Sequence, residues 1–373
     1  MSRLFHHSPR EGREPLIRMV KRPQIPWAKA NLIRAAALLG ALLAGALIIL
    51  LLGHNPLAVY ADMLEGSFGS KVSRTETVKI AVPLLGASLC VALAFKMKFW
   101  NIGAEGQIMM GAIAASYFAL FHHQNMPSWL LLTVMCLAGI IAGGLWGLIP
   151  AVFNAKWGIN ETLFTLMLNY IAIGFEKYLQ NGPWKENPNG FPKIAMFAAE
   201  ARLPRVFGVH VGWIIMLALV VIVFIYMKRT KQGYEISVVG ESKNTALYAG
   251  MNVKKIIIRT MFISGAIAGL VGFIQVSGAD FSLTESTSGG VGFTAITVAW
   301  LSKLNPIIMV FVSAFLAILQ KGSNRIQTDF KIPASAASVL TGIILFFMLG
   351  CEFFINYRLI FRGRKEKRNG YSN

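Results

Sequence analysis

Charged residues are scarce in this chain. Asp, Glu, Lys and Arg together make up only 14% of its 373 residues, whereas 55% are hydrophobic and the mean hydropathy is +0.56. A soluble domain carries about 25% charged residues. Here apolar runs recur at lengths near the roughly 20 residues that an α-helix needs to cross the hydrocarbon core of a bilayer. The composition leaves no room for a large soluble domain and predicts an all-α, polytopic integral membrane protein.

The sequence also lacks the motifs of common enzyme sites. It has no G-x-x-x-x-G-K-[ST] run to cradle a nucleotide and no H-E-x-x-H pair to hold a catalytic metal. Its histidines fall in tails or loops. Its three cysteines, Cys90, Cys136 and Cys351, fall in apolar runs without the spacing of a metal site or a disulfide framework. We therefore predict no catalytic residue, no metal site and no cofactor, and we interpret the cysteines as small core residues.

Acidic residues are few as well, 17 against 36 lysines and arginines, which gives a net charge of +19. The basic residues lie at the ends of apolar runs and in the two terminal tails. They are not interleaved with aromatic residues as in proteins that bind single-stranded nucleic acid. This distribution is typical of orientation in a bilayer and of attraction to anionic lipid. It predicts membrane lipid, and not nucleic acid, as the partner of the positive charge.

The apolar runs predict a membrane domain at 32–355 between two basic cytoplasmic tails, 1–31 and 356–373, of which the first is expected to be largely unstructured. Ten spans are expected, at 32–53, 77–95, 102–121, 129–153, 161–179, 211–227, 256–278, 289–301, 306–319 and 337–355. In this order more than two thirds of the lysines and arginines lie on the side of the termini, which places both termini inside. Eight spans with a re-entrant pair at 289–319 fit the same orientation.

Two segments between spans stand out. The 181–210 segment carries four prolines and is predicted to be external, whereas the 228–255 segment carries six basic residues and is predicted to stay in the cytoplasm. In the second segment, Ser242 is a suitable N-cap for a short helix that Gly250 is placed to end. A helix held between two spans could transmit a push from a cytoplasmic partner. The alternative is a solvated loop that only connects the spans.

The 99–111 segment, FWNIGAEGQIMMG, interrupts two apolar runs with Asn101, Glu105 and Gln107 and with glycines. A helix break at membrane depth is tolerated only where protein or a water-filled cavity covers it. The break marks either a translocation path or a capped helix start, with Glu105 or Gln107 as partners of the freed N–H groups. Glu161 fits a helix start in the same way. The spans carry no chain of Asp, Glu and His for a proton relay, which disfavours a proton-driven carrier.

Small residues recur at helical spacing. Gly139, Gly143 and Gly147 share one helix face, and Gly265 and Gly269 share another. Such faces allow membrane helices to approach closely, so we predict that both are packing surfaces. A place along a substrate path is the alternative.

Three segments carry a resemblance to a known family. The 99–111 segment resembles the F-N-I-G-x-E-G-Q signature of the permease subunits of bacterial sugar and nucleoside ABC importers. The 158–170 segment, GINETLFTLMLNY, is similar to the N-E-V-x-x-T-x-M-L-N-Y segment of that family. The 239–253 segment, VGESKNTALYAGMNV, is similar to its V-G-x-N-x-x-A-A-x-Y-A-G-I-N-V loop. The resemblance covers about 56–355, which is nearly the whole membrane part.

The N-terminal part of this region separates the branches of the family. Pro56, the 63–69 segment and Pro83 precede the signature in an arrangement that looks most like the nucleoside branch, which works with basic-membrane-protein-type lipoproteins. The departures from the family pattern are Trp100, Leu163, Ser242 and Thr245. They leave the class intact and bear only on the fine assignment of the substrate.

The resemblance implies a non-catalytic permease subunit of the large-type ABC importer fold, which moves nucleosides across a bacterial plasma membrane. The implied partners are a cytoplasmic ABC ATPase, a sister permease subunit and an extracytoplasmic substrate-binding lipoprotein. The residues implied to couple to the ATPase are Gly240, Glu241, Ser242, Asn244, Ala246, Tyr248, Ala249 and Gly250. The translocation-path candidates are Asn101, Glu105, Gln107, Glu161 and Asn169. A ribose-like sugar is the alternative substrate, and a proton-coupled secondary transporter is the alternative class.

Overall fold

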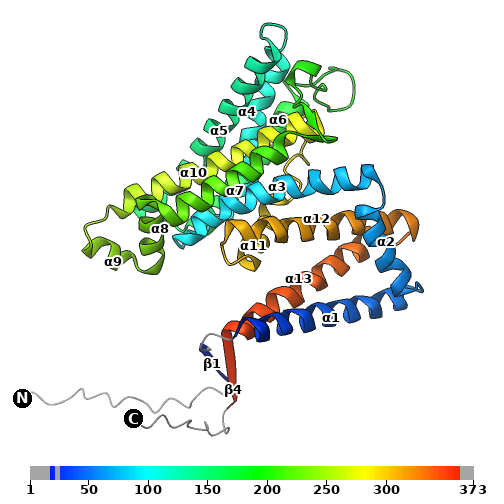
Figure 1. The fold of residues 1–373 in the computed structure, drawn as a ribbon. Coiled ribbons are helices and arrows are strands. Elements are labelled where there is room, and N and C mark those ends of the chain that lie inside the picture. The colour runs from blue at the N-terminus through cyan, green and yellow to red at the C-terminus, as the bar shows by residue number, and fades with distance from the viewer. Residues whose placement is uncertain (1–16, 22–25, 362–373) are drawn as a thin grey trace, which may run out of the picture. The chain divides into compact units, whose positions relative to one another are not determined.

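A computed structural model of the chain describes residues 17–21 and 26–361 (Figure 1). Helices dominate these residues, so the predicted all-α class is confirmed. The helices are α1 (Trp27–Leu51), α2 (Pro56–Phe68), α3 (Lys71–Lys96), α4 (Ala104–Phe121), α5 (Ser128–Trp157), α6 (Glu161–Asn181), α7 (Gly212–Arg229), α8 (Lys231–Glu241), α9 (Lys243–Tyr248), α10 (Val253–Ile274), α11 (Val291–Leu301), α12 (Pro306–Asp329) and α13 (Ala334–Asn356). The shorter elements are the 3₁₀ turn η1 (Ala199–Ala201), the π-helical turn η2 (Gln275–Asp280) and the strands β1 (Ile17–Lys21), β2 (Arg205–Val206), β3 (Val209–His210) and β4 (Tyr357–Phe361).

Each predicted span corresponds to a helix. Among the described residues, seven helices are long and apolar enough to cross a membrane, namely α1, α3, α5, α7, α10 with η2, α12 and α13. The helices α4 and α6 fall outside this set, and α11 has only 11 residues. A helix of that length is shorter than the hydrocarbon core is thick. The number of membrane crossings and their orientation therefore stay predictions.

Two helices, α3 and α12, extend farthest beyond the predicted spans. The first, α3, begins at Lys71 because the hydroxyl of Ser70 accepts the N–H of Ser73 at 2.9 Å and so caps the helix. The second, α12, continues through 320–329, where the sequence predicts an external stretch. This part of α12 is amphipathic, and it buries Ile326 while its charged side chains reach α2. The predicted spans end where the apolar run ends, whereas both helices continue through polar residues. Hydropathy alone therefore misplaces these two helix ends.

A small sheet lies where the sequence predicts two tails. Strand β1 pairs antiparallel with β4, from Ile17 opposite Phe361 to Lys21 opposite Tyr357. The N-terminal tail, expected to be largely unstructured, therefore contains one strand at 17–21. Both strands are rich in β-branched or aromatic residues, IRMVK and YRLIF, which fit a pleated surface. Of the rest of the two tails, 26–31 leads into and begins α1 and Asn356 ends α13, and the remaining residues lie outside the described part of the chain.

The chain divides into two compact units. The smaller unit joins the two ends of the chain, Met1–Ile48 with Gly342–Asn373, and the larger unit is Ile49–Thr341. In the smaller unit, Arg34 of α1 donates from its Nε to Oε1 of Glu352 in α13 at 2.7 Å. A charged group on an apolar helix is tolerated when it is paired. This ion pair therefore explains how Glu352 is accommodated in a helix that is otherwise apolar.

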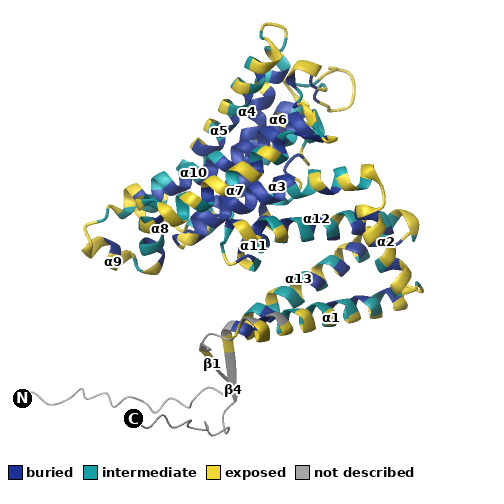
Figure 2. Cartoon of the chain, viewed as in Figure 1, coloured by how far each residue is buried: buried dark blue, intermediate teal, exposed yellow. Residues whose placement is uncertain are grey.

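The core of the larger unit lies along α3, α4 and α10, whose residues are mostly buried (Figure 2). Glycines bring three helix backbones into contact there. Gly143 of α5 lies against the carbonyl of Gly265 in α10, and Gly269 of α10 lies against the carbonyl of Gly139. Gly111 of α4 also lies against Gly269. Since any Cβ at these positions would meet backbone atoms, the predicted packing role of the two glycine faces is confirmed.

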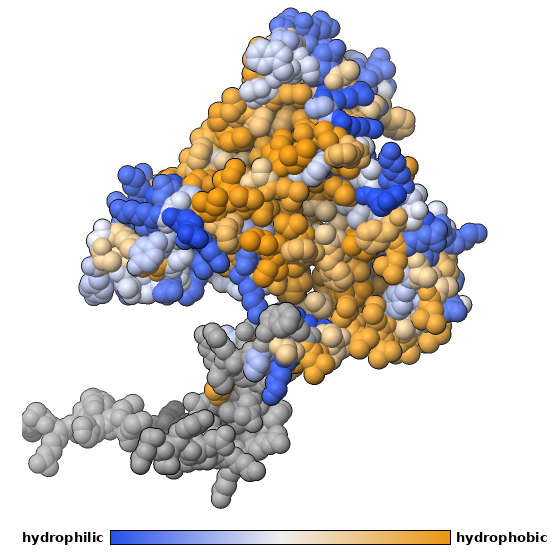
Figure 3. Space-filling view, in the orientation of Figure 1, coloured by the Kyte–Doolittle hydropathy of each residue, from blue (hydrophilic) through white to orange (hydrophobic). Residues whose placement is uncertain are grey.

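The surface of the larger unit has an apolar middle and polar ends (Figure 3). Hydrophobic residues cover the middle of the face in view, and hydrophilic residues gather around α8 and α9 and around the loops at the other ends of α5 and α6. The exposed residues of α5 include Leu137, Ile141 and Leu145. Large apolar side chains exposed in a continuous band are typical of a surface that faces lipid.

Candidate functional site

Residues 97–103 form a connector between α3 and α4, called here the α3–α4 connector. The chain leaves helical geometry in it, and Lys98 has a φ of +55°. Asn101 is fully buried, and its Oδ1 accepts the N–H of Gly103 at 3.0 Å. Asn side chains stabilise turns of this kind because they replace a missing backbone partner. The predicted break at membrane depth is thus a closed turn covered by protein.

Helix α6 supplies the other partners of the freed backbone groups. The hydroxyl of Thr165 accepts the N–H of Ile102 at 3.2 Å. Asn169 accepts the N–H of Gly106 at 2.8 Å and donates to the carbonyl of Ile102 at 2.9 Å. The sequence predicts partners within α4 itself, Glu105 or Gln107, and this prediction is wrong. Residues of α6 reach these groups because α6 packs along the start of α4.

A buried polar cluster, made of Asn101, Gln107, Ser264 and Cys90, ties the connector to α3, α4 and α10. The Nδ2 of Asn101 donates to Oε1 of Gln107 at 3.3 Å and lies 3.4 Å from Oγ of Ser264. The hydroxyl of Ser264 donates to the carbonyl of Cys90 at 2.8 Å. None of the four is more than 1% exposed. Amides and hydroxyls satisfy one another here, which fixes the geometry of the connector.

Glu105 joins α4 to α11. Its two carboxylate oxygens accept the backbone N–H groups of Gly290 at 2.7 Å and of Gly292 at 2.6 Å, and only 3% of the residue is exposed. Gly290 begins α11 at a φ of +75° and has no side chain to cap the helix. A carboxylate at a helix N-terminus binds the unpaired N–H groups and the positive end of the helix dipole. The Glu105 carboxylate therefore caps the N-terminus of a helix that lies far away in the sequence.

Trp100, which lies within the signature segment, adds an aromatic contact between the α3–α4 connector and α11. Its ring stacks on Trp300 of α11 with the centroids 5.7 Å apart, and Phe95 of α3 lies edge-on to it at 5.1 Å. Stacked aromatic rings add to the burial of apolar surface. This departure from the family pattern has a structural account, because the connector uses it to contact α11.

Four of the five translocation-path candidates come together, and Glu161 does not. Asn101, Glu105, Gln107 and Asn169 surround the connector, each at most 3% exposed. Glu161 opens α6 and accepts a hydrogen bond of 2.9 Å from Asn154 of α5. This hydrogen bond joins the end of α5 to the start of α6, a position where a carboxylate is favoured. The described residues include no group of His, Cys, Asp and Glu that could hold a metal ion.

The predicted cytoplasmic segment contains two helices. Ser242 caps the second one, α9, because its Oγ accepts the N–H of Thr245 at 3.2 Å, and Gly250 follows with a φ of +74°. The predicted short helix and both of its end signals are therefore confirmed. The sequence does not predict α8. Its signal is weak because α8 holds two glycines, Gly233 and Gly240, and each of them lies against backbone atoms of another segment.

Gly240 connects α8 to the end of α3. A Cβ at this position would meet the carbonyl of Lys96 and the Cα of Met97, so only glycine fits. Glu235 of α8 also binds Arg259 of α10, with 3.0 Å between Oε2 and Nη2. Helix α8 thus rests on α3 and α10 through a backbone contact and an ion pair.

The predicted ATPase-coupling residues divide by exposure. Gly240 and Ala246 are buried, and Ser242 is partly buried as the cap. The exposed members are Glu241, Asn244, Tyr248, Ala249 and Gly250. Leu247, which the resemblance does not single out, is 59% exposed beside Tyr248 at 93%. A pair of exposed apolar side chains on a short helix is a feature of protein contact surfaces.

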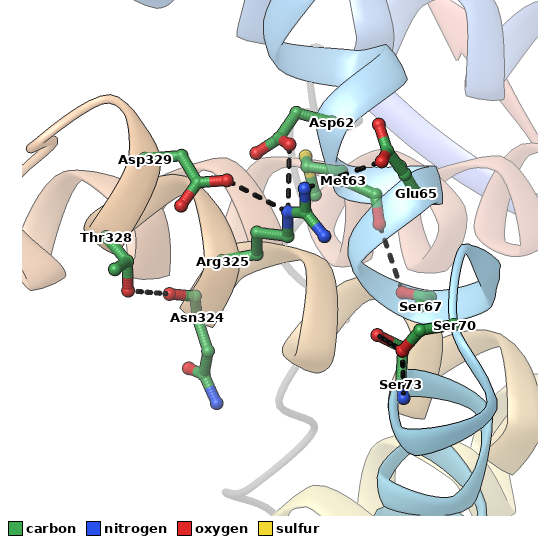
Figure 4. A network of polar contacts seen from close by, with 10 residues as sticks. All are labelled: Asp62, Met63, Glu65, Ser67, Ser70, Ser73, Asn324, Arg325, Thr328 and Asp329. Atoms are coloured by element: carbon green, nitrogen blue, oxygen red, sulfur yellow. Dashed lines mark hydrogen bonds and ion pairs between the residues drawn. The ribbon is translucent and has the colours of Figure 1, made fainter.

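An ion-pair cluster joins α2 to α12 (Figure 4). The Nε of Arg325 lies 2.9 Å from Oδ1 of Asp62 and 3.0 Å from Oδ2 of Asp329, and its Nη2 lies 3.6 Å from Oε1 of Glu65. The aliphatic part of the Arg325 side chain packs on Gly66, where a Cβ would lie 2.6 Å from Cδ of Arg325. Sequence reasoning misses this cluster because its two halves are 263 positions apart.

His210 is the buried titratable group of the predicted external segment. Only 2% of it is exposed in β3, and its Nδ1 has no hydrogen-bond partner among the described residues. Burial, together with the positive charges of Lys79 and Arg205, lowers the pKa of His210 to about 4. The imidazole is therefore neutral at physiological pH.

Comparisons with known proteins show the family to which the chain belongs. Residues 75–349 match the family described as "Branched-chain amino acid transport system / permease component". The chain belongs to this family. It is accordingly a multi-pass permease of the plasma membrane, which agrees with the predicted location and with the apolar helices of the fold.

Three relatives cover most of the chain. The chain is 32% identical to "Glucose ABC transporter permease protein TsgB13" of Haloferax volcanii, over 86% of this chain and 87% of the relative. It is 30% identical to "Guanosine ABC transporter permease protein NupP" of Bacillus subtilis, over 91% of this chain and 97% of the relative. It is 31% identical to "Nucleoside ABC transporter permease protein NupB" of Lactococcus lactis subsp. cremoris, over 88% of this chain and 93% of the relative. The predicted resemblance to ABC importer permeases is confirmed.

Proposed function

We propose that this chain is the membrane permease subunit of an ABC importer for nucleosides and that a partner ATPase drives it by hydrolysing ATP. Two relatives that align over nearly their whole length are named as guanosine and nucleoside permeases. Their agreement with the nucleoside-type arrangement of the sequence at 56–83 is the observation that carries the choice of substrate. In this proposal the chain performs no covalent chemistry.

A simple sugar is the second candidate substrate, because the relative from Haloferax volcanii is named as a glucose permease. A proton-coupled carrier is a weaker candidate. Glu105 is bound to backbone N–H groups, and the cluster around Asn101 consists of amides, a hydroxyl and a thiol. A proton relay needs a chain of titratable groups with access to water.

The proposed partners are those of an ABC importer. A cytoplasmic ATPase binds the exposed residues of α8 and α9, a sister permease completes the membrane part, and an extracytoplasmic lipoprotein delivers the substrate. The exposed side chains Glu241, Asn244, Leu247 and Tyr248 offer the ATPase a mixed polar and apolar contact surface. The basic residues at both ends of this segment favour its cytoplasmic placement.

Gly240 carries the proposed coupling. Since α8 touches the end of α3 without an intervening side chain, a displacement of α8 and α9 moves the α3–α4 connector directly. The connector holds α6 through Asn169, and Glu105 beside it holds α11. A push from the ATPase on α8 would thus reach α3, α6 and α11 through close contacts. Such a rigid movement is the physical basis of alternating access in this proposal.

The translocation-path candidates have a mechanical role in this scheme. Asn101, Gln107 and Asn169 fix the connector, and Glu105 fixes α11, so these residues position the helices of the path. Glu161 fixes the corner between α5 and α6. In this scheme the five candidates do not contact the substrate. Other side chains contact it, on the helices that these residues hold in place.

Uptake of radiolabelled guanosine tests the proposal. Cells with and without the gene are compared, with glucose and ribose in parallel, after depletion of ATP or after collapse of the proton gradient. We expect guanosine uptake that requires ATP and survives loss of the gradient. Sugar uptake instead would favour the second substrate. Uptake that stops on gradient collapse with ATP intact would contradict the importer mechanism.

A further inference from the structure

A pocket of about 470 Å³ lies between the start of α3, the hairpin of β2 and β3, and the start of α7. It is separate from the polar cluster around the connector. Its lining includes Lys71, Arg74, Val78, Val206, Phe207 and Trp213. All of these residues belong to the larger unit. The pocket combines two cations with an apolar and aromatic wall, a composition that the transport mechanism does not use.

The two cations of the pocket have no acidic partner among the described residues. Within the part of the chain that the structure describes, neither Lys71 nor Arg74 forms an ion pair, although their neighbours Lys79 and Glu76 pair at 2.7 Å. Arg74 only approaches the carbonyl of Ser70, at 3.4 Å. Both side chains are exposed. The pocket therefore has a positive charge that an anionic group could balance.

The polarity of the pocket is graded along α3. Arg74 lies about one turn and Lys71 about two turns before Val78, so the two cations stand roughly 6 Å and 10 Å from Val78 along the helix axis. Beyond Val78 and Lys79 the helix becomes a continuous apolar run, and Trp213 is the second residue of the candidate span α7. Trp is enriched where a span meets the polar headgroups. The apolar end of the pocket thus points toward the membrane and the cationic end points away from it.

The hairpin holds an aromatic side chain over the pocket at a conformational cost. Phe207 and Gly208 form its turn with φ values of +55° and +87°, and a Cβ at Gly208 would lie 3.2 Å from Cγ2 of Thr75, so the turn rests on α3. A bulky residue rarely adopts a positive φ. Phe207 is 87% exposed in spite of this strain. An exposed aromatic residue kept in a strained turn is a feature of binding surfaces.

From this geometry we propose that the pocket binds an anionic phospholipid. The phosphate lies between Lys71 and Arg74, and the start of an acyl chain lies along Val78, Trp213 and Phe207. A protein partner with acidic side chains would satisfy the cations, but it gives no reason for an apolar wall that continues into a membrane span. The proposal does not depend on the substrate or on the partner ATPase.

Native mass spectrometry of the full-length chain in detergent tests the proposal. Phosphatidylglycerol and phosphatidylcholine with the same acyl chains are added in equal amounts. We expect one tightly bound phosphatidylglycerol, and we expect Lys71→Ala with Arg74→Ala to weaken its binding roughly ten- to thirty-fold, because each cation near a headgroup contributes about 1 kcal/mol. Phe207→Asn places a residue that tolerates a positive φ in the turn. It should weaken the binding of both lipids because it removes the apolar contact.

The control removes two positive charges from the same predicted external side, by Lys185→Ala with Lys193→Ala. These lysines lie outside the pocket, so the control should bind phosphatidylglycerol as the parent does. Equal binding of both lipids by the parent, or an equal loss in the control, would overturn the proposal. Efficient displacement by glycerol phosphate would point to a headgroup-only anion site and would also overturn it. So would a double variant that loses binding to the extracytoplasmic binding protein while lipid binding is unchanged.

Discussion

Oε2 of Glu105 in α4 lies 2.6 Å from the backbone nitrogen of Gly292 in α11, a residue 187 positions away. The other oxygen binds the N–H of Gly290, so one carboxylate binds two backbone N–H groups at the start of α11. The same turn of α4 is held to α6, because the N–H of Gly106 donates to Asn169. The beginning of α4 is therefore a joint where α6 and α11 are fixed to the α3–α4 connector. A displacement of the connector must move both helices or break these bonds.

Glu105→Gln tests the joint. The amide keeps one acceptor but places an NH₂ group against a backbone N–H, and hydrogen bonds to a charged acceptor are worth about 1.5–3 kcal/mol. We expect a lower melting temperature of the purified protein and reduced uptake. Glu161→Gln is the matched control, because its partner is the amide of Asn154 at a partly exposed corner, and it should change both quantities little. Equal effects of the two variants would argue against a special role for Glu105.

Gly240→Ala tests the contact between α8 and α3. Its Cβ would meet the carbonyl of Lys96, so α8 must shift, and overpacking of this kind costs about 1–3 kcal/mol. In the reconstituted transporter we expect a several-fold loss of substrate-stimulated ATPase activity with the chain still in the membrane. Gly174→Ala in α6 is the control, because a Cβ there meets nothing within 4 Å. Normal substrate-stimulated ATPase activity in Gly240→Ala would contradict the proposed role of this contact in coupling.

The cluster around Arg325 predicts a charge-swap result. Arg325→Asp places a fourth carboxylate beside Asp62, Glu65 and Asp329 and should lower the melting temperature through repulsion. Adding Asp62→Arg restores an opposite-charge pair between α2 and α12, and we expect the double variant to recover part of the loss. Asp62→Arg alone should also be destabilising. If the two single effects simply add in the double variant, the pair does not interact and the prediction fails.

His210 predicts a dependence of stability on acid pH. Its pKa is about 4 in the folded protein and near 6.5 in the unfolded chain, so the unfolded chain binds the proton first as the pH falls. The stability contribution is complete above pH 6.5 and is lost between pH 6.5 and 4, by at most about 3 kcal/mol. Melting temperatures over this range should fall less steeply in His210→Gln than in the parent. A His123→Asn variant controls for the loss of a partly exposed loop histidine, and a parental slope in His210→Gln would contradict the assignment.

The orientation of α9 predicts a labelling pattern. Asn244 is exposed on α9, so a cysteine there should react with an impermeant thiol reagent. In a background without Cys90, Cys136 and Cys351, we expect Asn244→Cys to be labelled only when the cytoplasmic side is open to the reagent. Labelling of intact cells from outside would reverse the predicted topology. Lys71→Cys lies on the predicted external side, so it should be labelled in intact cells from outside.

Local chemistry explains what the sequence predicts correctly. The hydroxyl of Ser242 can cap only the residues that follow it, and Gly250 can end the helix because its left-handed φ needs no distant contact. The same holds for the glycine faces of α5 and α10, since spacing by four places the small residues on one side of a helix. Apolar length likewise predicts the membrane class and the ten helices that correspond to predicted spans.

The sequence by itself thus determined that the chain is a helical membrane permease and which segments carry its signature. The tertiary structure decided what the signature residues do. Asn101 and Asn169 complete a turn, Glu105 caps α11, and Arg325 binds α2, because packing brings together partners that are distant in the chain. A polar residue in an apolar sequence shows that it needs a partner. The identity of that partner is set only when helices far apart in the chain fold against one another.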